Sequence, residues 1–180
     1  MQGLALLIID VQDSFLKVIP HSEELLKRCG FAIESANLFG IKTFYTEQYS
    51  EKLKETHTGL LEKGLNQCKC FKKNAFSAFG VEDFEDHLRK EGIEHLLIAG
   101  VETSICVYQT IMDALRLDFE VTMLSDCVAG RRENDSQAVT AYLQKTECHI
   151  LPSETVFFSL FRTGQHPNFK QFNQIVKKYS

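Results

Sequence analysis

The chain has 180 residues, enough for one domain with a substantial core and short for two. Hydrophobic residues make up 44%, charged residues 24% and the net charge is −4 at pH 7, a balance typical of a globular protein. A nucleic-acid binder more often carries a basic excess, and no stretch approaches the ~20 apolar residues of a membrane span, so neither class of protein is favoured.

The first part of the chain begins with a strand and a helix. Residues 4–9 form a continuous apolar run, which suits a strand buried on both faces and places Asp10 at its carboxyl end. Residues 22–38 predict an amphipathic helix, with Ser22 as its N-cap and Gly40 just beyond its end. A second strand is predicted at 41–46. The polar stretch 47–67 is predicted to be a long loop with room for one helical turn.

The rest of the chain repeats the alternation of strands and helices. Further strands are predicted at 70–73, 96–99, 119–124 and 148–151, and further helices at 82–90, 104–117, 136–145, 154–161 and 169–178. This order predicts an α/β sandwich with a mostly parallel sheet, and a single domain over residues 1–180. Ligands of such sheets bind beyond the carboxyl ends of the strands. Asp10, Lys73, Asp126 and the turn 100–106 all fall at or near these ends.

The six cysteines are irregularly spaced and predict no disulfide framework. Asp10 interrupts the first apolar run, so we expect no signal peptide. The expected compartment is the reducing cytoplasm, with all thiols free.

Cys106 is the first candidate for chemistry, because it lies in a predicted strand-to-helix turn. A thiol in the first turn of a helix lies near unpaired N–H groups and the positive end of the helix dipole, which favour the nucleophilic thiolate. The same N–H groups could hold an oxyanion. The alternative is that Cys106 is a small buried hydrophobic residue, as most free cysteines are.

Asp10 and Lys73 are the other two candidates. A carboxylate directly after an apolar strand could take the thiol proton, or it could cap the following turn. A lysine beside a carboxylate and a thiol would keep both ionised, although a lysine pair such as Lys72 and Lys73 is usually a solvated face. Alternation in so short a strand does not say which lysine points inward.

Other patterns predict no cofactor and no metal. The six histidines lack the spacing of a zinc site, and Cys68 and Cys70, on one side of a strand, are two ligands without a second pair. The chain has no Gly-x-Gly-x-x-Gly fingerprint, no Walker loop and no Gly-x-Ser-x-Gly elbow.

Four segments together resemble the isochorismatase-like cysteine hydrolases. They are LIIDVQDSF at 7–15, KNAFSAF at 73–79, GVETSICV at 100–107 and SDCVAGR at 125–131. The resemblance implies a three-layer sandwich with a six-stranded parallel sheet and helices on both faces. It also implies a triad of Asp10, Lys73 and Cys106, which selects Lys73 over Lys72. It further implies a cis peptide between Val101 and Glu102, so that the N–H groups of Glu102 and Cys106 form an oxyanion hole.

The branch of the family is indicated by two further segments. Nicotinamidases carry a metal-binding Asp-x-His motif after the second strand, where this chain has TEQY at 46–49. That run and HPNFK at 166–170 are more similar to the isochorismatase-domain proteins of eukaryotes and their small bacterial relatives. Because relatives assemble, the resemblance also implies a homo-oligomer.

The sequence thus predicts a hydrolase that acts on a small amide or related carbonyl compound through a cysteine nucleophile. Gln12, Phe15, Gln48 and Tyr49 are candidates to line the substrate pocket. The expected partner is a small-molecule substrate, with no nucleic acid and no membrane. Two other classes stay open, a redox-active thiol protein and a catalytically idle oligomeric scaffold.

Overall fold

The apolar runs of the sequence form a six-stranded sheet in which every pair of neighbouring strands is parallel. The structure, a computed structural model, describes residues 3–161 and 163–180. The strand order is β3-β2-β1-β4-β5-β6. The strands are β1 (Leu4–Ile9), β2 (Lys42–Gln48), β3 (Lys69–Lys73), β4 (His95–Val101), β5 (Glu120–Ala129) and β6 (His149–Leu151).

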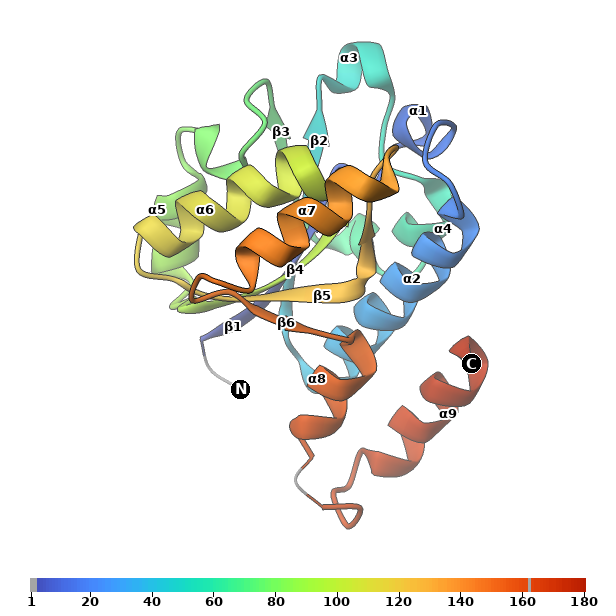
Figure 1. Cartoon of the computed structure of the whole chain (residues 1–180). Coiled ribbons are helices and arrows are strands. Elements are labelled where there is room, and N and C mark those ends of the chain that lie inside the picture. The colour runs from blue at the N-terminus through green and yellow to red at the C-terminus, as the bar shows by residue number, and fades with distance from the viewer. Residues whose placement is uncertain (1–2, 162) are drawn as a thin grey trace.

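Helices cover both faces of this sheet, as Figure 1 shows. The described α-helices are α1 (Asp13–Leu16), α2 (Ser22–Phe39), α3 (Ser50–Leu53), α4 (Thr58–Leu61), α5 (Phe84–Lys90), α6 (Tyr108–Arg116), α7 (Glu133–Leu143), α8 (Ser153–Ser159) and α9 (Phe169–Tyr179). One face packs against α2, α4, α8 and α9, and the other packs against α5, α6 and α7. The predicted three-layer α/β sandwich with a six-stranded parallel sheet is confirmed.

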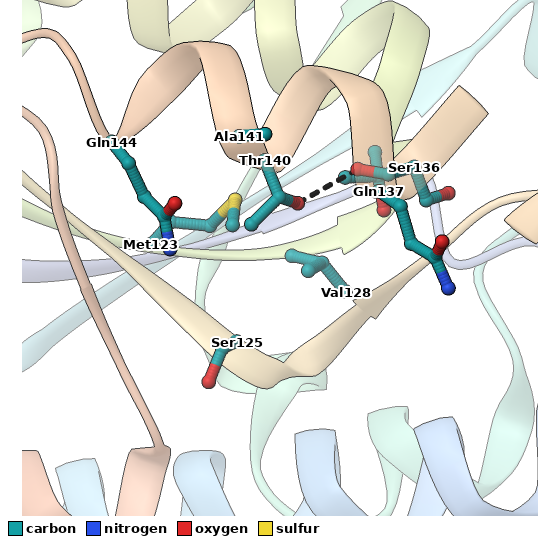
Figure 2. Close-up of a pocket in the computed structure, with 9 residues that line it drawn as sticks. Met123, Ser125, Val128, Ser136, Gln137, Thr140, Ala141 and Gln144 are labelled. Atoms are coloured by element: carbon teal, nitrogen blue, oxygen red, sulfur yellow. Dashed lines mark hydrogen bonds between the residues drawn. The ribbon is translucent and has the colours of Figure 1, made fainter. Parts of the chain in front are cut away.

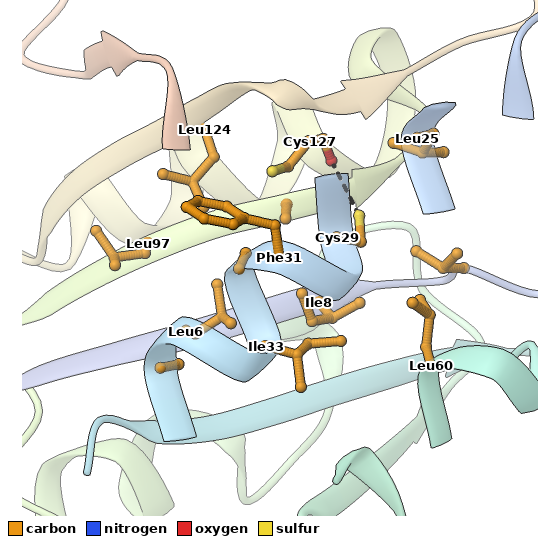
Figure 3. Close-up of a cluster of buried hydrophobic side chains, with 14 of the residues drawn as sticks. Leu6, Ile8, Leu25, Cys29, Phe31, Ile33, Leu60, Leu97, Leu124 and Cys127 are labelled. Carbon is orange, nitrogen blue, oxygen red and sulfur yellow. Dashed lines mark hydrogen bonds between the residues drawn. The ribbon is translucent and has the colours of Figure 1, made fainter. Parts of the chain in front are cut away.

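Strand alternation divides the core into two parts. In β1, Leu6 and Ile8 point towards α2, while Leu7 and Ile9 point towards α5 and α6. Figure 3 shows Leu6 and Ile8 meeting side chains of α2, among them Phe31. All of these side chains are fully buried. The central strand β1 therefore has no polar face, which is why its sequence is apolar at every position.

The predicted loop 47–67 contains more regular structure than expected. Strand β2 continues through Glu47 to Gln48, and the chain then forms α3, α4 and the 3-10 turn η1 (Leu65–Gln67). A second 3-10 turn, η2 (Ala78–Gly80), follows β3. The expected N-cap of α2 was also wrong. His21 occupies that position in a left-handed conformation, and Ser22 is the first helical residue. Gly40 ends α2 in the left-handed conformation, as predicted.

The fifth strand differs from its prediction because it continues past Ser125 through a bulge. Met123 pairs with Ile98 of β4, and Val128 pairs with Gly100, so the intervening residues of β5 are out of register with β4. Asp126 lies in this bulge. Its carboxylate accepts hydrogen bonds from the Arg28 Nε, at 2.8 Å, and from the Ser153 backbone N–H and hydroxyl, both at 2.7 Å. Asp126 therefore joins α2 and α8 to the sheet.

Within residues 3–161 and 163–180, no helix is both long enough and apolar enough to cross a membrane.

Candidate active site

Asp10 directly follows β1, a strand in the interior of the sheet. Its backbone is left-handed, with φ of 52°, a conformation that aspartate tolerates better than most residues. The side chain is fully buried, and its Oδ1 accepts a hydrogen bond of 2.7 Å from the Thr46 hydroxyl. The Asp10 N–H donates to the Thr46 carbonyl oxygen at 3.2 Å. The end of β2 therefore fixes both the backbone and the carboxylate of Asp10.

Lys73 ends β3, and its side chain is fully buried while Lys72 is exposed. The Lys73 Nζ lies 2.6 Å from the Asp10 Oδ2 and 2.5 Å from the Gln48 Oε1. It also donates to the carbonyl oxygens of Phe76, at 2.8 Å, and Ala75, at 3.2 Å. A buried ammonium group needs such partners, and these four acceptors use all of its N–H groups.

Cys106 lies in the π-helical turn η3 (Thr103–Val107), between β4 and α6. The Val107 N–H donates to the Glu102 carbonyl oxygen at 3.2 Å, across five residues. The peptide bond between Val101 and Glu102 is cis, as the resemblance implied. Cys106 is only 5% exposed, and it packs on the face of the sheet that α5 and α6 cover.

Asp10 and Lys73 shift the pKa of the Cys106 thiol in opposite directions. Burial and then the Asp10 carboxylate raise the pKa of the Cys106 thiol to about 12, against a smaller lowering by Lys73. Burial also raises the pKa of Asp10, although Lys73, Thr46 and Cys106 lower it. The sequence led us to expect a favoured thiolate, whereas burial and the Asp10 charge raise the thiol pKa in the resting site. A carboxylate with a raised pKa is a stronger base for a thiol proton.

Glu102, whose N–H is a predicted oxyanion donor, is held by its side chain. The buried carboxylate accepts hydrogen bonds of 3.0 Å from the Arg131 backbone N–H and from the Arg131 Nε. Arg131 follows β5, so this contact joins the end of β5 to the turn that carries Cys106.

Two of the four predicted substrate contacts, Gln12 and Gln48, are buried and occupied by internal hydrogen bonds. The Gln48 amide accepts from Lys73 and donates to the Asn74 carbonyl oxygen at 3.0 Å. The Gln12 Oε1 accepts from the Gln48 N–H at 2.8 Å, and its Nε2 donates to the Gln48 carbonyl oxygen at 3.1 Å. Gln12 thus pairs with the backbone of β2 as a neighbouring strand would.

The other two predicted substrate contacts, Phe15 and Tyr49, are less buried. Phe15 on α1 is half-buried and packs against the core on the α2 side of the sheet. Tyr49 follows β2, is 45% exposed, and donates its N–H to the Lys73 carbonyl oxygen at 3.0 Å. Thr46 was not predicted as a site residue, although it lies near the end of β2, the strand that pairs with β1.

A pocket of about 290 Å³ lies between β5 and α7, where Figure 2 shows hydroxyl and amide side chains around an apolar floor. Its lining includes Thr103 from the nucleophile turn and none of Asp10, Lys73 or Cys106. Across residues 3–161 and 163–180, no three or more His, Cys, Asp or Glu side chains are grouped so as to hold a metal ion.

Comparison with known proteins matches residues 4–155 to the isochorismatase domain. Isochorismatase family protein 1B of Dictyostelium discoideum is 29% identical over 97% of this chain and 86% of its own length. The MAR1 ribonuclease from Caenorhabditis elegans has a similar structure, with a TM-score of 0.91, 26% identity, and coverage of 97% of this chain and 90% of that one. The YcaC gene product of Escherichia coli, described as an octameric hydrolase of unknown specificity, has a TM-score of 0.86 at 17% identity, with coverage of 98% and 93%.

Proposed function

Since the chain belongs to the isochorismatase family, a family of hydrolases, we propose that it hydrolyses a small amide or related carbonyl compound with Cys106 as nucleophile. One observation carries this proposal. A thiol, a carboxylate and an ammonium group from three strand ends share one buried site, in which the Asp10 and Lys73 charges act on the thiol in opposite directions.

The proposed reaction is covalent acyl transfer. Asp10 accepts the Cys106 proton as the sulfur attacks the substrate carbonyl carbon, and the N–H groups of Glu102 and Cys106 hold the oxyanion. Collapse of the tetrahedral intermediate breaks the C–N bond, and Asp10 returns the proton to the leaving nitrogen. Asp10 then takes a proton from water, whose oxygen attacks the thioester carbonyl carbon. The C–S bond breaks, the acid leaves, and Asp10 returns the proton to the Cys106 sulfur. Lys73 keeps Asp10 in place and balances the charge.

The burial of the site supports a small substrate. Cys106 is 5% exposed and Lys73 is 3% exposed, so only a small molecule can reach the sulfur without a large rearrangement. The raised thiol pKa and the burial also count against the redox alternative, because redox-sensing cysteines are usually accessible and have low pKa values. Assembly into a homo-oligomer stays a prediction, which sedimentation velocity can test.

A screen of small amides and ureas tests the proposal, with release of ammonia or amine as the readout. The Cys106→Ala variant should lose all turnover and keep the thermal unfolding midpoint of the wild type, while Cys148→Ala, at another buried cysteine, should keep turnover. An acyl-enzyme trapped by acid quench should add its mass to the peptide that contains Cys106. Retention of turnover in Cys106→Ala would refute the nucleophile.

RNA cleavage is a second candidate, and it is supported by the names of similar structures, among them the MAR1 ribonuclease from Caenorhabditis elegans. The net charge of −4 is unfavourable for a polyanionic substrate. Incubation with labelled RNA distinguishes the two. Cleavage that disappears in Cys106→Ala would favour a nuclease over an amidohydrolase, and cleavage that survives it would indicate a contaminant.

A further inference from the structure

Glu47 is a buried carboxylate that the proposed chemistry does not use. It lies one residue before the end of β2, between Thr46 and Gln48, and is 4% exposed. Because side chains alternate along a strand, Glu47 points to the face of the sheet opposite the one that its two neighbours share with Lys73. A buried carboxylate is costly unless it accepts hydrogen bonds, so its partners identify what it holds.

One partner of Glu47 is Thr56, in the segment between α3 and α4; the Cys70 thiol on β3 is another. The Glu47 Oε1 accepts a hydrogen bond of 2.8 Å from the Thr56 N–H and one of 3.0 Å from the Thr56 hydroxyl. Thr56 is itself buried. The Glu47 side chain on β2 therefore anchors the segment between α3 and α4, which comes several residues after the strand in the sequence.

The anchored segment runs beside the two residues that follow Asp10. Thr56 and Gln12 form an antiparallel bridge, and the His57 N–H donates to the Val11 carbonyl oxygen at 2.9 Å. The Gln12 Nε2 donates to the Lys54 carbonyl oxygen at 2.6 Å. The segment thus fixes the amide of Gln12, which in turn pairs with both backbone groups of Gln48.

This set of contacts ends at the triad. The Gln48 Oε1 lies 2.5 Å from the Lys73 Nζ, which lies 2.6 Å from the Asp10 carboxylate. We propose that Glu47 is a positioning residue, which acts from the far face of the sheet through Thr56 and Gln12 to hold Gln48, and therefore Lys73, against Asp10. The inference rests on the proposed function, because it assumes that Lys73 and Asp10 control the Cys106 thiol.

The chemistry of the contact suggests a matched pair of variants. Both Thr56 hydrogen bonds end on one Glu47 oxygen, which the amide oxygen of Glu47→Gln can replace. Glu47→Leu has a similar size and no acceptor. Glu51→Gln, on the exposed surface of α3, makes the same charge change without this contact and serves as the control.

The readout is the rate at which iodoacetamide alkylates Cys106, followed by peptide mass spectrometry as a function of pH. Lys73 lowers the thiol pKa, so a displaced Lys73 should slow alkylation. We expect Glu47→Leu to be slower by about tenfold, the effect of one pKa unit, and Glu47→Gln and Glu51→Gln to match the wild type. Lys73→Met gives the upper limit of the effect. Thr56→Val, which removes only the hydroxyl, should fall between Glu47→Leu and the wild type.

The outcomes separate the inference from the function. A folded Glu47→Leu with wild-type alkylation, beside a slow Lys73→Met, overturns the positioning role and leaves the triad intact. Wild-type alkylation in Lys73→Met overturns both. If Glu47→Leu does not fold, the Thr56→Val variant provides the test. Slower alkylation of Cys106 than in the wild type supports the positioning role, and an unchanged pH profile refutes it.

Discussion

At the scale of single residues, the Asp10 carboxylate opposes ionisation of the Cys106 thiol, whereas the hydrogen bond from the thiol lowers the pKa of Asp10 and favours its ionised form. The Asp10 charge raises the thiol pKa, while Lys73 lowers it by a smaller amount. The resting site therefore holds a protonated thiol beside a base of raised pKa, and the proton moves only when a substrate carbonyl is present to take up the developing negative charge. This arrangement protects a buried nucleophile from other electrophiles.

The Asp10→Asn variant should separate thiol ionisation from catalysis. Removal of the carboxylate leaves Lys73 as the charged neighbour of Cys106, so the thiol pKa should fall below about 12. Alkylation at neutral pH should then rise, by about tenfold for each pKa unit, while turnover is lost with the base. The measurement is the pH profile of alkylation at Cys106 by mass spectrometry.

Asp13→Asn provides the control for this variant. Asp13 lies on α1, and its partly exposed side chain faces His57, so its neutralisation should leave the Cys106 profile unchanged. If Asp10→Asn left the profile unchanged or moved it to higher pH, the proposed coupling of the two groups would be incorrect.

At the scale of elements, Gly100 lets β1 and β4 approach each other where the site begins. Its φ is +119°, and an added Cβ would overlap the Ile9 carbonyl oxygen and lie 2.6 Å from the Ile9 backbone nitrogen. Gly100 pairs with Ile9 in the sheet, directly before Asp10 on one strand and the cis peptide on the other. A side chain here would separate the two strand ends.

Gly100→Ala should therefore destabilise the protein by about 3 kcal/mol, from the clash and the backbone conformation together. Gly92→Ala is the matched control, because Gly92 also has a positive φ, of 69°, but no atom within 4 Å of an added Cβ. It should cost about 1 kcal/mol, from the backbone conformation alone. Urea unfolding measures both. Equal costs would show that the close approach to Ile9 contributes nothing.

The sequence predicted the elements well where one local pattern decides the structure. The apolar run before Asp10 and the helical spacing after Ser22 needed no tertiary information. The π turn at Cys106 did not follow from the same spacing, because one extra residue in a turn leaves apolar periodicity almost unchanged. The bulge in β5 was not predicted for a similar reason, because the sequence around Asp126 is equally typical of the end of a strand.

The sequence predicted which residues form the candidate site, but it did not predict the contacts between them. Resemblance selected Lys73, whereas the pairing of Gln48 with Lys73 depends on the register of β2 against β3, which the sequence does not state. The direction of the Cys106 pKa shift was missed because it depends on the depth of burial, a property of the folded chain.

At the scale of the whole molecule, the sheet separates two hydrophobic cores, of which only one contains Cys106. The core on the α2 side contains the aromatic cluster around Phe172 of α9, whose ring centroid lies 4.9 Å from that of Phe158 and 4.9 Å from that of Phe161. The core on the other side contains Cys106 and the ring of Phe84, which lies 4.9 Å from that of Phe71 on β3. Substitutions in the two cores should therefore differ in their effect on the site.

Phe172→Ala and Phe84→Ala test this separation, because both side chains are fully buried. Each should lower the free energy of unfolding by about 3–5 kcal/mol. Only Phe84→Ala should change the alkylation rate of Cys106, since its cavity borders Phe71, two residues before Lys73, whereas the Phe172 cavity lies beyond the sheet. The rates are compared well below both unfolding midpoints. An equal change in both variants would mean that the sheet transmits packing defects between its faces, and the site would then depend on α9 as much as on α5.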